Sequence, residues 1–388
     1  MGRVTGRVLI TGARAPAALD LARGFAGAGY EVHLADSRPG LMARLSGQAA
    51  GLHRHASPVL EPEAFWRDID GLVRALEPVL IAPVCEEVFH LAHAAERADW
   101  AQRLFAPSSE LLDRLHSKFR FIDLCETLGL PAPTTRRIAS RAELAEAAGS
   151  ASEKVFKAEY SRFGADVVIG PSAARLARID PTQARPWVVQ DRVVGREACF
   201  YAVALGGRLT AFSAYEAAWR LRGGAGYAFT SLETSMQDRL SAMAGRLAGF
   251  VGTGQFACDL IIDAEDRPWL IECNPRATSG VHLFGGGRGL ADAMTGQGAG
   301  TAVGDHDGWL GPAMWRYGLP TALWQGRLAA WRAERRRGQD VIGRGEKGAA
   351  IGAVFDSAAF SLRALLAGQS LEQAMTADIE WNGPGDAS

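Results

Sequence analysis

The sequence has little cysteine, no excess of charge of either sign and no long apolar run. Its five cysteines lie far apart without a C-x-x-C pair, which argues against a disulfide framework or structural zinc and favours a reducing cytoplasm. The 42 basic and 43 acidic residues leave a formal charge of −1, so no global positive field favours nucleic acid or an anionic membrane. No apolar run approaches the roughly 18 residues of a membrane span, and the first residues lack an apolar signal-peptide core.

What is present is the composition of a globular protein, with 48% hydrophobic and 22% charged residues in a chain of 388. At roughly 150 residues per domain, that length predicts two or three domains. Strand and helix patterns alternate over the first 115 residues, which predicts a parallel sheet covered by helices. We expect strands at 7–11, 30–36 and 79–84 and helices at 16–28 and 86–95.

The later regions have other patterns, and we divide the chain at 1–115, 116–190, 191–300 and 301–388. A helix at 117–128 and strands at 153–158 and 165–170, joined by a polar loop, predict a small α+β unit. Strands at 187–190, 197–205 and 208–214 follow, then one amphipathic helix from Met236 to Phe250 and a strand pair at 255–262 and 267–273. Beyond residue 300 we expect helices at 324–337 and 358–366, and no pattern there predicts a function.

The strand pair at 255–262 and 267–273 contains the first candidate functional residues. If its turn is centred between Glu265 and Asp266, antiparallel pairing places Asp259 opposite Glu272, with Asn274 on the same face. Ile271 and Cys273 would then lie on the opposite, core face. Two carboxylates that converge repel each other, and a cation would relieve this. Oxygen ligands suit Mg²⁺ or Mn²⁺ rather than zinc, although geometry alone also allows a solvated polar face beside a turn.

The segment Ile271-Glu-Cys-Asn-Pro-Arg276, preceded by Asp259, resembles the metal-binding strands of the ATP-grasp superfamily. That superfamily includes carbamoyl-phosphate synthase, biotin carboxylase and D-alanine–D-alanine ligase. The resemblance implies an ATP-grasp fold of mixed α/β and α+β class. A Rossmann-like pre-ATP-grasp domain would span 1–115, a small lid subdomain 116–190, a large subdomain with the metal site 191–300, and a helical C-terminal extension 301–388.

The resemblance also implies the nucleotide site. Metal ligands Asp259, Glu272 and Asn274 would hold two Mg²⁺ (or Mn²⁺) ions on the phosphates of ATP, with Arg276 facing the transferred phosphate. The remaining residues match the superfamily's two lysines, its phosphate loop and its adenine hinge: Lys118, Lys157, Ser161, Gly164, Gln190, Asp191, Val193 and Glu197. Lys157 and Arg276 would act in catalysis. Gln190 would meet the adenine amino group, Asp191 and Val193 would offer backbone contacts, and Glu197 would bind the ribose.

By resemblance, the expected reaction is ATP-dependent amide formation through an acylphosphate, on an amino acid or small peptide. The partners are a small-molecule carboxylate and an amine, and a homodimer is compatible with the resemblance. The nucleophile could instead be a thiol or bicarbonate. Candidate substrate-lining residues lie at a strand–helix junction, beside a glycine run and after Arg276: Glu86, Glu87, Arg220, Arg222, Ser279, Gly280 and His282.

Two other classes remain open. The start Val8-Leu-Ile-Thr-Gly-Ala-Arg, with Asp36 ending the second strand, suggests a dinucleotide-binding oxidoreductase. G-x-G-x-x-G is absent, however, and no tyrosine has a lysine four residues later. A nucleotide sensor without chemistry is the third class. The pairs His53/His55 and His90/His93 could bind metal but better fit a loop and a helix surface.

Overall fold

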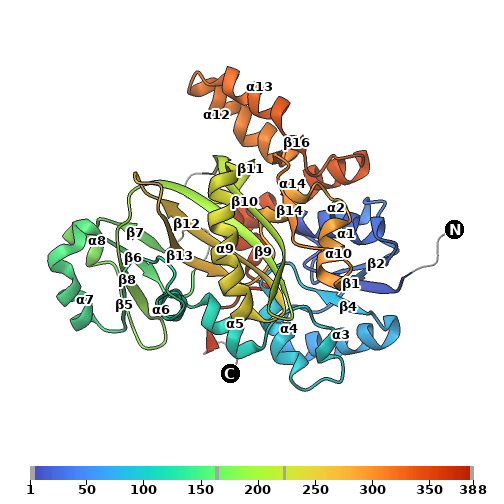
Figure 1. Ribbon diagram of the computed structural model, residues 1–388, viewed down its shortest axis with the longest axis horizontal. Helices are drawn as coiled ribbons and strands as arrows, with labels where there is room; N and C mark the ends of the chain where they lie inside the picture. The colour runs from blue at the N-terminus through green and yellow to red at the C-terminus, as the bar shows by residue number, and fades with distance from the viewer. Residues whose placement is uncertain (1–4, 162–165, 222–223, 385–388) are drawn as a thin grey trace.

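The computed structural model describes residues 5–161, 166–221 and 224–384, without the side chain at position 372. It contains three β-sheets (Figure 1). In Figure 1 the N-terminal sheet lies at the right, a small sheet at the left, and an eight-stranded sheet between them, with the long helix α9 in front. The candidate site residues come from the parts where these sheets approach one another.

The N-terminal sheet is parallel, as predicted, and its strands have the order β3-β2-β1-β4. Its strands are β1 (Arg7–Thr11), β2 (Glu31–Asp36), β3 (Gly51–Arg54) and β4 (Leu80–Ala82). Its helices are α1 (Pro16–Gly27), α2 (Leu41–Arg44), α3 (Pro62–Leu76), α4 (Glu87–Ala95) and α5 (Ser109–His116), with a short turn η1 (Ala101–Arg103). The sequence analysis did not predict β3 or α3. His53 lies in β3, beside His33, so its expected place in a loop is wrong.

The small sheet is antiparallel with the order β5-β8-β6-β7. Its strands are β5 (Thr135–Ile138), β6 (Lys154–Ala158), β7 (Val167–Ile169) and β8 (Trp187–Asp191). The short helices α7 (Arg141–Ala147), η2 (Ala148–Glu153) and α8 (Ala173–Leu176) accompany it. Strands β6 and β7 form the predicted hairpin. The polar segment between them, 159–166, is called the lid loop below, and the structure describes its residues 159–161 and 166.

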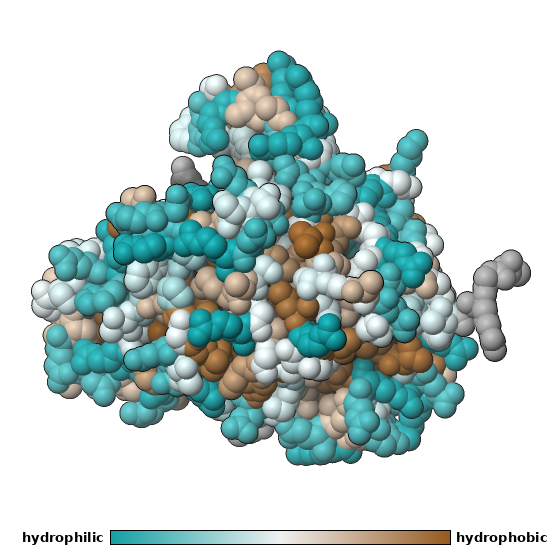
Figure 2. Space-filling view, in the orientation of Figure 1, coloured by the Kyte–Doolittle hydropathy of each residue, from teal (hydrophilic) through white to brown (hydrophobic). Residues whose placement is uncertain are grey.

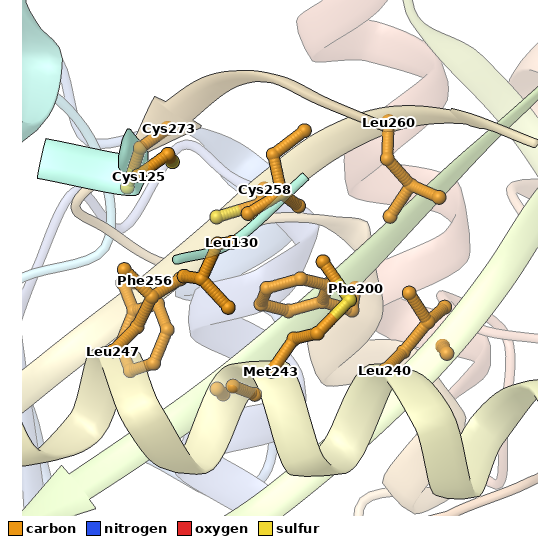
Figure 3. Packing of buried hydrophobic residues seen from close by; sticks show 14 of the residues in the cluster. Cys125, Leu130, Phe200, Leu240, Met243, Leu247, Phe256, Cys258, Leu260 and Cys273 are labelled. Atoms are coloured by element: carbon orange, nitrogen blue, oxygen red, sulfur yellow. The ribbon is translucent and has the colours of Figure 1, made fainter. Parts of the chain in front are cut away.

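The eight-stranded sheet has the order β13-β12-β9-β10-β11-β15-β16, with β14 paired to β10. Its strands are β9 (Arg196–Leu205), β10 (Arg208–Arg220), β11 (Gly226–Ser231), β12 (Gly254–Ile262), β13 (Pro268–Asn274), β14 (Ala302–Gly304), β15 (Gly308–Trp309) and β16 (Gln339–Asp340). Helices α6 (Lys118–Thr127) and α9 (Thr234–Val251) contribute to its core. In Figure 3, Leu240, Met243 and Leu247 of α9 pack against Phe200 and Phe256, as the predicted helical spacing requires.

The C-terminal region is helical, as expected, but its boundaries differ from the prediction. After η3 (Ser279–Phe284) and α10 (Gly289–Thr295) come α11 (Gly311–Ala313), η4 (Met314–Gly318), α12 (Leu319–Trp324), α13 (Leu328–Arg337), α14 (Lys347–Ala367) and α15 (Leu371–Thr376). The helix predicted at 324–337 is α13, but it begins later, at Leu328, because the helical backbone is interrupted at Gly326 (φ +67°), where glycine tolerates the left-handed conformation. Helices α12 and α13 protrude at the top of Figure 1 and are mainly hydrophilic in Figure 2.

Helix α14 is long and apolar enough to cross a membrane, judged by length and composition alone, a test that the core helix of a globular protein also passes. Asp356 and Arg363 lie within it, so it is not an uninterrupted apolar run. One face of α14 packs against α2. A Cβ at Gly348 would lie 2.6 Å from the Leu45 carbonyl oxygen, and one at Gly352 would lie 2.5 Å from the backbone of Leu41. Glycine is required at both positions because the two backbones approach so closely. This packing joins the C-terminal region to the N-terminal domain.

The end of the chain is anchored by a buried ion cluster. Arg14, at the β1–α1 junction, donates to Asp378 Oδ1 at 2.7 Å and Oδ2 at 2.9 Å and also pairs with Asp36. Ser37 Oγ donates to Asp378 Oδ2 at 2.6 Å. The side chains of Arg14 and Asp378 are 3% and 1% exposed. Charges this deeply buried persist only when they are paired and hydrogen-bonded, so the C-terminal segment is an integral part of the N-terminal domain.

We therefore expect Asp378→Asn to lower the free energy of unfolding by about 3 kcal/mol, because it leaves Arg14 with one buried carboxylate instead of two. Burial alone would raise the pKa of Asp378, but the hydrogen bonds and charge of Arg14 outweigh it and lower that pKa. A carboxylate with a lowered pKa stabilises the fold above its unfolded pKa and loses this effect as the pH falls. The difference between wild type and variant should thus shrink below about pH 4.

Urea denaturation at several pH values measures this difference. The control is Asp180→Asn, which removes an exposed partner of Arg141 and should change stability by less than about 0.5 kcal/mol. Equal effects of the two variants would contradict the structural role of the Arg14 cluster.

Candidate functional site

The predicted carboxylate pair is present: Asp259 on β12 lies opposite Glu272 on β13. A β-bulge follows at once, since the register shifts between Asp259 and Leu260 and Leu260 pairs with Leu270. The prediction that Ile271 faces the core is therefore wrong. Leu270 takes that place with 0% exposure, and Ile271 is half-buried. The extra residue of the bulge bends the strand next to the carboxylates, as bulges near functional sites commonly do.

The turn that joins β12 to β13 is fixed by Asp263. Its Oδ1 accepts the backbone N–H groups of Glu265 at 3.0 Å and Arg267 at 2.8 Å, and its Oδ2 accepts the indole N–H of Trp269 at 2.9 Å. Asp266 takes the left-handed backbone conformation with φ +57°, which aspartate tolerates better than most residues. Because the turn sets hairpin register, these bonds determine that Asp259 and Glu272 share one face.

Two buried lysines from different elements approach the carboxylate pair. Lys118 begins α6; its Nζ lies 3.6 Å from Glu272 Oε2 and donates to the backbone oxygen of Ser161 in the lid loop at 2.9 Å. Lys157 near the end of β6 donates to Gln190 Oε1 at 2.9 Å. The lysines are 3% and 5% exposed. The structure thus gathers both predicted lysines, Ser161 and Gln190 around one carboxylate.

The protonation states follow from this arrangement. Burial, followed by the charge of Glu272, raises the pKa of Asp259. Burial would also raise the pKa of Glu272, but the charges of Lys118 and then Lys157 lower it. Burial lowers the pKa of Lys157, although Glu272 opposes that shift. Like charges held side by side push their pKa values apart, so the site favours a further positive charge beside Asp259.

Neighbouring side chains continue the polar arrangement along β13. Asn274 Nδ2 donates to Asp259 Oδ2 at 3.3 Å, and Arg276 Nη2 donates to Asn274 Oδ1 at 3.2 Å. The Cys199 thiol on β9 donates to Asp259 Oδ1 at 2.8 Å. The sequence analysis missed Cys199. Its place opposite Asp259 depends on the pairing of β12 with β9, strands about 60 residues apart, for which the sequence has no local signal.

The donor set fits a hard divalent cation. The described residues hold no group of three or more histidine, cysteine, aspartate or glutamate side chains able to bind a metal ion. Two carboxylates and the Asn274 amide oxygen are nonetheless enough for Mg²⁺, which usually keeps one or two carboxylates and takes its other ligands from substrate phosphates and water. A divalent cation would favour the charged form of Asp259, whose pKa burial and the charge of Glu272 raise.

The predicted adenine hinge lies where β8 leaves the small sheet. Gln190 is buried, and besides accepting from Lys157 it donates to Thr135 Oγ1 at 3.0 Å. A contact with an adenine amino group would therefore require Gln190 to exchange a partner. Asp191 pairs with Lys154, and Glu197 pairs with Arg220. Val193 lies in the connection between β8 and β9, half-buried.

The predicted substrate residues divide into groups. Glu86 is buried near Arg276, with Oε1 3.7 Å from Nη2. Glu87 accepts the Thr11 hydroxyl at 2.7 Å and two backbone N–H groups, so it fixes the β4–α4 junction. His282 is buried against Asp20 of α1, with Nδ1 2.9 Å from Oδ2.

The remaining substrate residues lie at the start of η3 and at the end of β10. Ser279 and Gly280 begin η3, where a Cβ at Gly280 would meet Tyr201 at 2.3 Å, so only glycine fits. Arg220 ends β10. Two predicted residues, Gly164 and Arg222, lie outside the described residues.

The contacts of Asp36 argue against the hypothesis of a dinucleotide-binding oxidoreductase. Asp36, placed where an acidic residue would bind a ribose, instead accepts the backbone N–H of Arg14 at 2.9 Å and that of Arg38 at 2.7 Å. It also pairs with the buried Arg14 guanidinium. A ribose contact would have to break this cluster.

Most of the chain aligns with solved structures. N5-carboxyaminoimidazole synthetase from Staphylococcus aureus, complexed with ADP, aligns over 78% of this chain and 80% of its own, with 12% identity and TM-score 0.60. Phosphoribosylamine–glycine ligase from Thermotoga maritima covers 78% of each chain, with 17% identity and TM-score 0.59. L-amino acid ligase from Bacillus licheniformis covers 73% of this chain and 69% of its own, with 13% identity and TM-score 0.54.

This chain has the ATP-grasp fold. No protein-family model and no curated protein matches its sequence. At identities this low, the solved structures establish the fold alone. The positions of Lys118, Lys157, Asp259 and Glu272 on α6, β6, β12 and β13 come from this chain's own geometry.

The metal assignment predicts that Glu272→Gln weakens binding of Mn²⁺–ADP more than about tenfold, because it keeps the shape of the side chain and removes one negative charge from the donor set. Mn²⁺ titration followed by electron paramagnetic resonance measures free and bound ion directly. The control Glu265→Gln, in the exposed hairpin turn, should bind as wild type does. Unchanged Mn²⁺ binding by Glu272→Gln would contradict the assignment.

Proposed function

We propose that this protein is an ATP-dependent, ADP-forming ligase that joins a small carboxylate to an amine through an acylphosphate. The observation that carries the proposal is the convergence of Asp259 and Glu272 with Lys118, Lys157 and Arg276. The fold alone is compatible with a protein that only binds nucleotide. Two half-buried carboxylates beside two buried lysines and a half-buried arginine form the charge arrangement that transfer of a phosphoryl group requires.

The reaction follows from the charges. The γ-phosphoryl group of ATP passes to an oxygen of the substrate carboxylate, which releases ADP and forms an acylphosphate. An amine then attacks the acyl carbon, the C–O bond breaks and phosphate leaves with the electron pair, and the amine proton passes to solvent. Lys157 and Arg276 offset the charge that develops on the phosphoryl oxygens. Mg²⁺ held by Asp259, Glu272 and Asn274 would supply further positive charge at the phosphates.

The lid loop has a plain task in this reaction. Water would hydrolyse an acylphosphate, so the site must exclude it while the amine attacks. Lys118 already links the lid loop to the carboxylates, because its Nζ contacts both Ser161 O and Glu272. Closure of the lid would therefore bring the backbone of Ser161 and the side chain of Lys118 to the phosphates together.

An amino acid or small peptide is the substrate class that we propose. The names of two solved structures, L-amino acid ligase and phosphoribosylamine–glycine ligase, support amino acids as a class for this fold. Screening amino-acid pairs for ADP release, with mass detection of the product, tests the proposal. Amide products with stoichiometric ADP support it. A thioester or a carboxylated product would favour the thiol or bicarbonate alternative, and ATP binding without turnover of any pair would favour a sensor.

Glu197→Ala should raise the KM for ATP about tenfold or more with a smaller effect on kcat. Hydrogen bonds from a charged group to the ribose stabilise ground and transition states equally, so their loss weakens binding alone. Initial-rate kinetics with varied ATP measure both constants. The control is Glu216→Ala. Glu216 on β10 pairs with Arg196 on β9, and its removal should leave the KM for ATP unchanged. An equal KM for ATP in wild type and Glu197→Ala would contradict the assignment of the nucleotide site to Glu197.

Arg276→Lys should lower kcat by about 10²-fold or more, the scale of losing one preorganised transition-state donor. Lysine keeps the charge but not the planar fork that can grip two phosphoryl oxygens. Affinity for a non-hydrolysable ATP analogue should fall far less. A surface control is Arg288→Lys, which disturbs only the pair with Asp292. If Arg276→Lys lowered the melting temperature but left kcat per folded molecule unchanged, Arg276 would be structural.

A further inference from the structure

The C-terminal segment, residues 378–383, reaches the candidate site although it lies more than 100 residues beyond β13. Asp378 is held by Arg14 and Ser37 at the carboxyl ends of β1 and β2, and Ser57 Oγ donates to its backbone oxygen at 2.7 Å. Figure 1 shows the red end of the chain beside α5, and Trp381 donates to Asp113 of that helix. The segment thus crosses the edge of the N-terminal sheet where open parallel sheets bind their ligands.

Trp381 anchors the segment. Its side chain is 1% exposed. The indole ring stacks on Phe89 of α4, with ring centroids 5.8 Å apart and planes 6° from parallel. The indole N–H donates to Asp113 Oδ1 at 2.8 Å. A fully buried tryptophan with its N–H satisfied defines the position of the backbone around it, because the ring has only one place to pack.

The backbone of Trp381 donates to Glu86, an acidic residue beside Arg276. Its N–H donates to Glu86 Oε2 at 3.1 Å. The other oxygen of the same carboxylate, Oε1, lies 3.7 Å from Nη2 of Arg276. Glu86 is 4% exposed. The segment and the guanidinium therefore hold opposite oxygens of one buried carboxylate, and movement of the segment would change the position of the charge that faces Arg276.

The segment also touches the lid loop. A Cβ at Gly383 would lie 2.8 Å from the ring of Tyr160. Tyr160 precedes Ser161, whose backbone oxygen accepts from Lys118. Gly383 has φ +106°, a conformation that glycine adopts readily and other residues rarely do. The last described residues thus contact both Glu86, the carboxylate beside Arg276, and the start of the lid loop.

We propose that Trp381 is a positioning residue of the active site: by anchoring the C-terminal segment it fixes Glu86, and through Glu86 it fixes the orientation of Arg276. This inference rests on the proposed ligase function for its catalytic consequence. Its structural part, the ordering of the loop that follows β13, holds for the protein without any substrate. The two parts are therefore tested separately.

The chain supplies a matched control in Trp100. Trp100 lies in the same apolar cluster as Trp381, is 2% exposed, and donates its indole N–H to Asp70 at 3.1 Å. Removing either ring creates a similar cavity in the same cluster and should lower the melting temperature to a similar extent. Only Trp381, however, contacts Glu86 through its backbone. A difference between the two variants beyond stability therefore reports positioning.

The first measurement is hydrogen exchange by mass spectrometry on the substrate-free proteins. Trp381→Leu should raise exchange in peptides covering residues 275–284 at least fivefold, whereas Trp100→Leu should leave those peptides as in wild type. Trp381→Phe keeps a stacking ring but loses the hydrogen bond to Asp113, so its exchange should lie between those of wild type and Trp381→Leu. Unchanged exchange at 275–284 in Trp381→Leu, or an equal rise in Trp100→Leu, would overturn the positioning role whatever the function of the protein.

The second measurement is steady-state kinetics, corrected for the folded fraction. Trp381→Leu should lower kcat at least tenfold and leave the KM for ATP within twofold, because Arg276 acts on the transferred group rather than on nucleotide binding. Trp100→Leu should keep kcat within twofold. A KM change without a kcat change, or equal kcat losses in both variants, would overturn the catalytic part. If wild type turned over no substrate, the proposed function would fail, and hydrogen exchange alone would decide the structural part.

Discussion

The repulsion between Asp259 and Glu272 is the constraint on which the rest of the site depends. A tight turn at Asp263 and a β-bulge at Ile271 hold the two carboxylates opposite each other on β12 and β13. Such a pair is costly unless positive charge is near. Lys118 supplies positive charge from α6, and Lys157 supplies it from the small sheet. The two carboxylates therefore also determine where the small sheet must lie relative to the eight-stranded sheet.

Ion pairs and hydrogen bonds connect the carboxylates to both ends of the chain. Asn274 and Arg276 continue β13 and lead to Glu86, which belongs to the N-terminal domain and accepts the backbone N–H of Trp381. The C-terminal segment is in turn locked by Arg14. Buried charges therefore link the first helix junction, the metal-binding strand and the last described residues. A substitution in any one of these segments should therefore destabilise the others, because removing one partner of an ion pair leaves the other charge buried without compensation.

Local sequence patterns could predict much of this. Alternating strand and helix patterns identified the parallel sheet, the 3.6-residue spacing identified α9, and the two-residue period with a polar turn placed Asp259 opposite Glu272. The bulge at Ile271 could not be predicted, because the alternation of apolar and polar residues does not show where one strand carries an extra residue. Cys199 and Trp381 were missed since their contacts join segments far apart in the chain. The break at Gly326 shows the limit of helix prediction where a single glycine interrupts a polar pattern.

The central claim is that the carboxylate pair holds a divalent cation at the phosphates of a bound nucleotide. A crystal structure with Mn²⁺ and ADP, with data collected at the manganese edge, tests it most directly. The account predicts an anomalous peak within about 2.5 Å of a carboxylate oxygen of both Asp259 and Glu272, and in contact with the β-phosphate. ADP bound with no anomalous peak between these two side chains, or with the peak elsewhere on the protein, would contradict it.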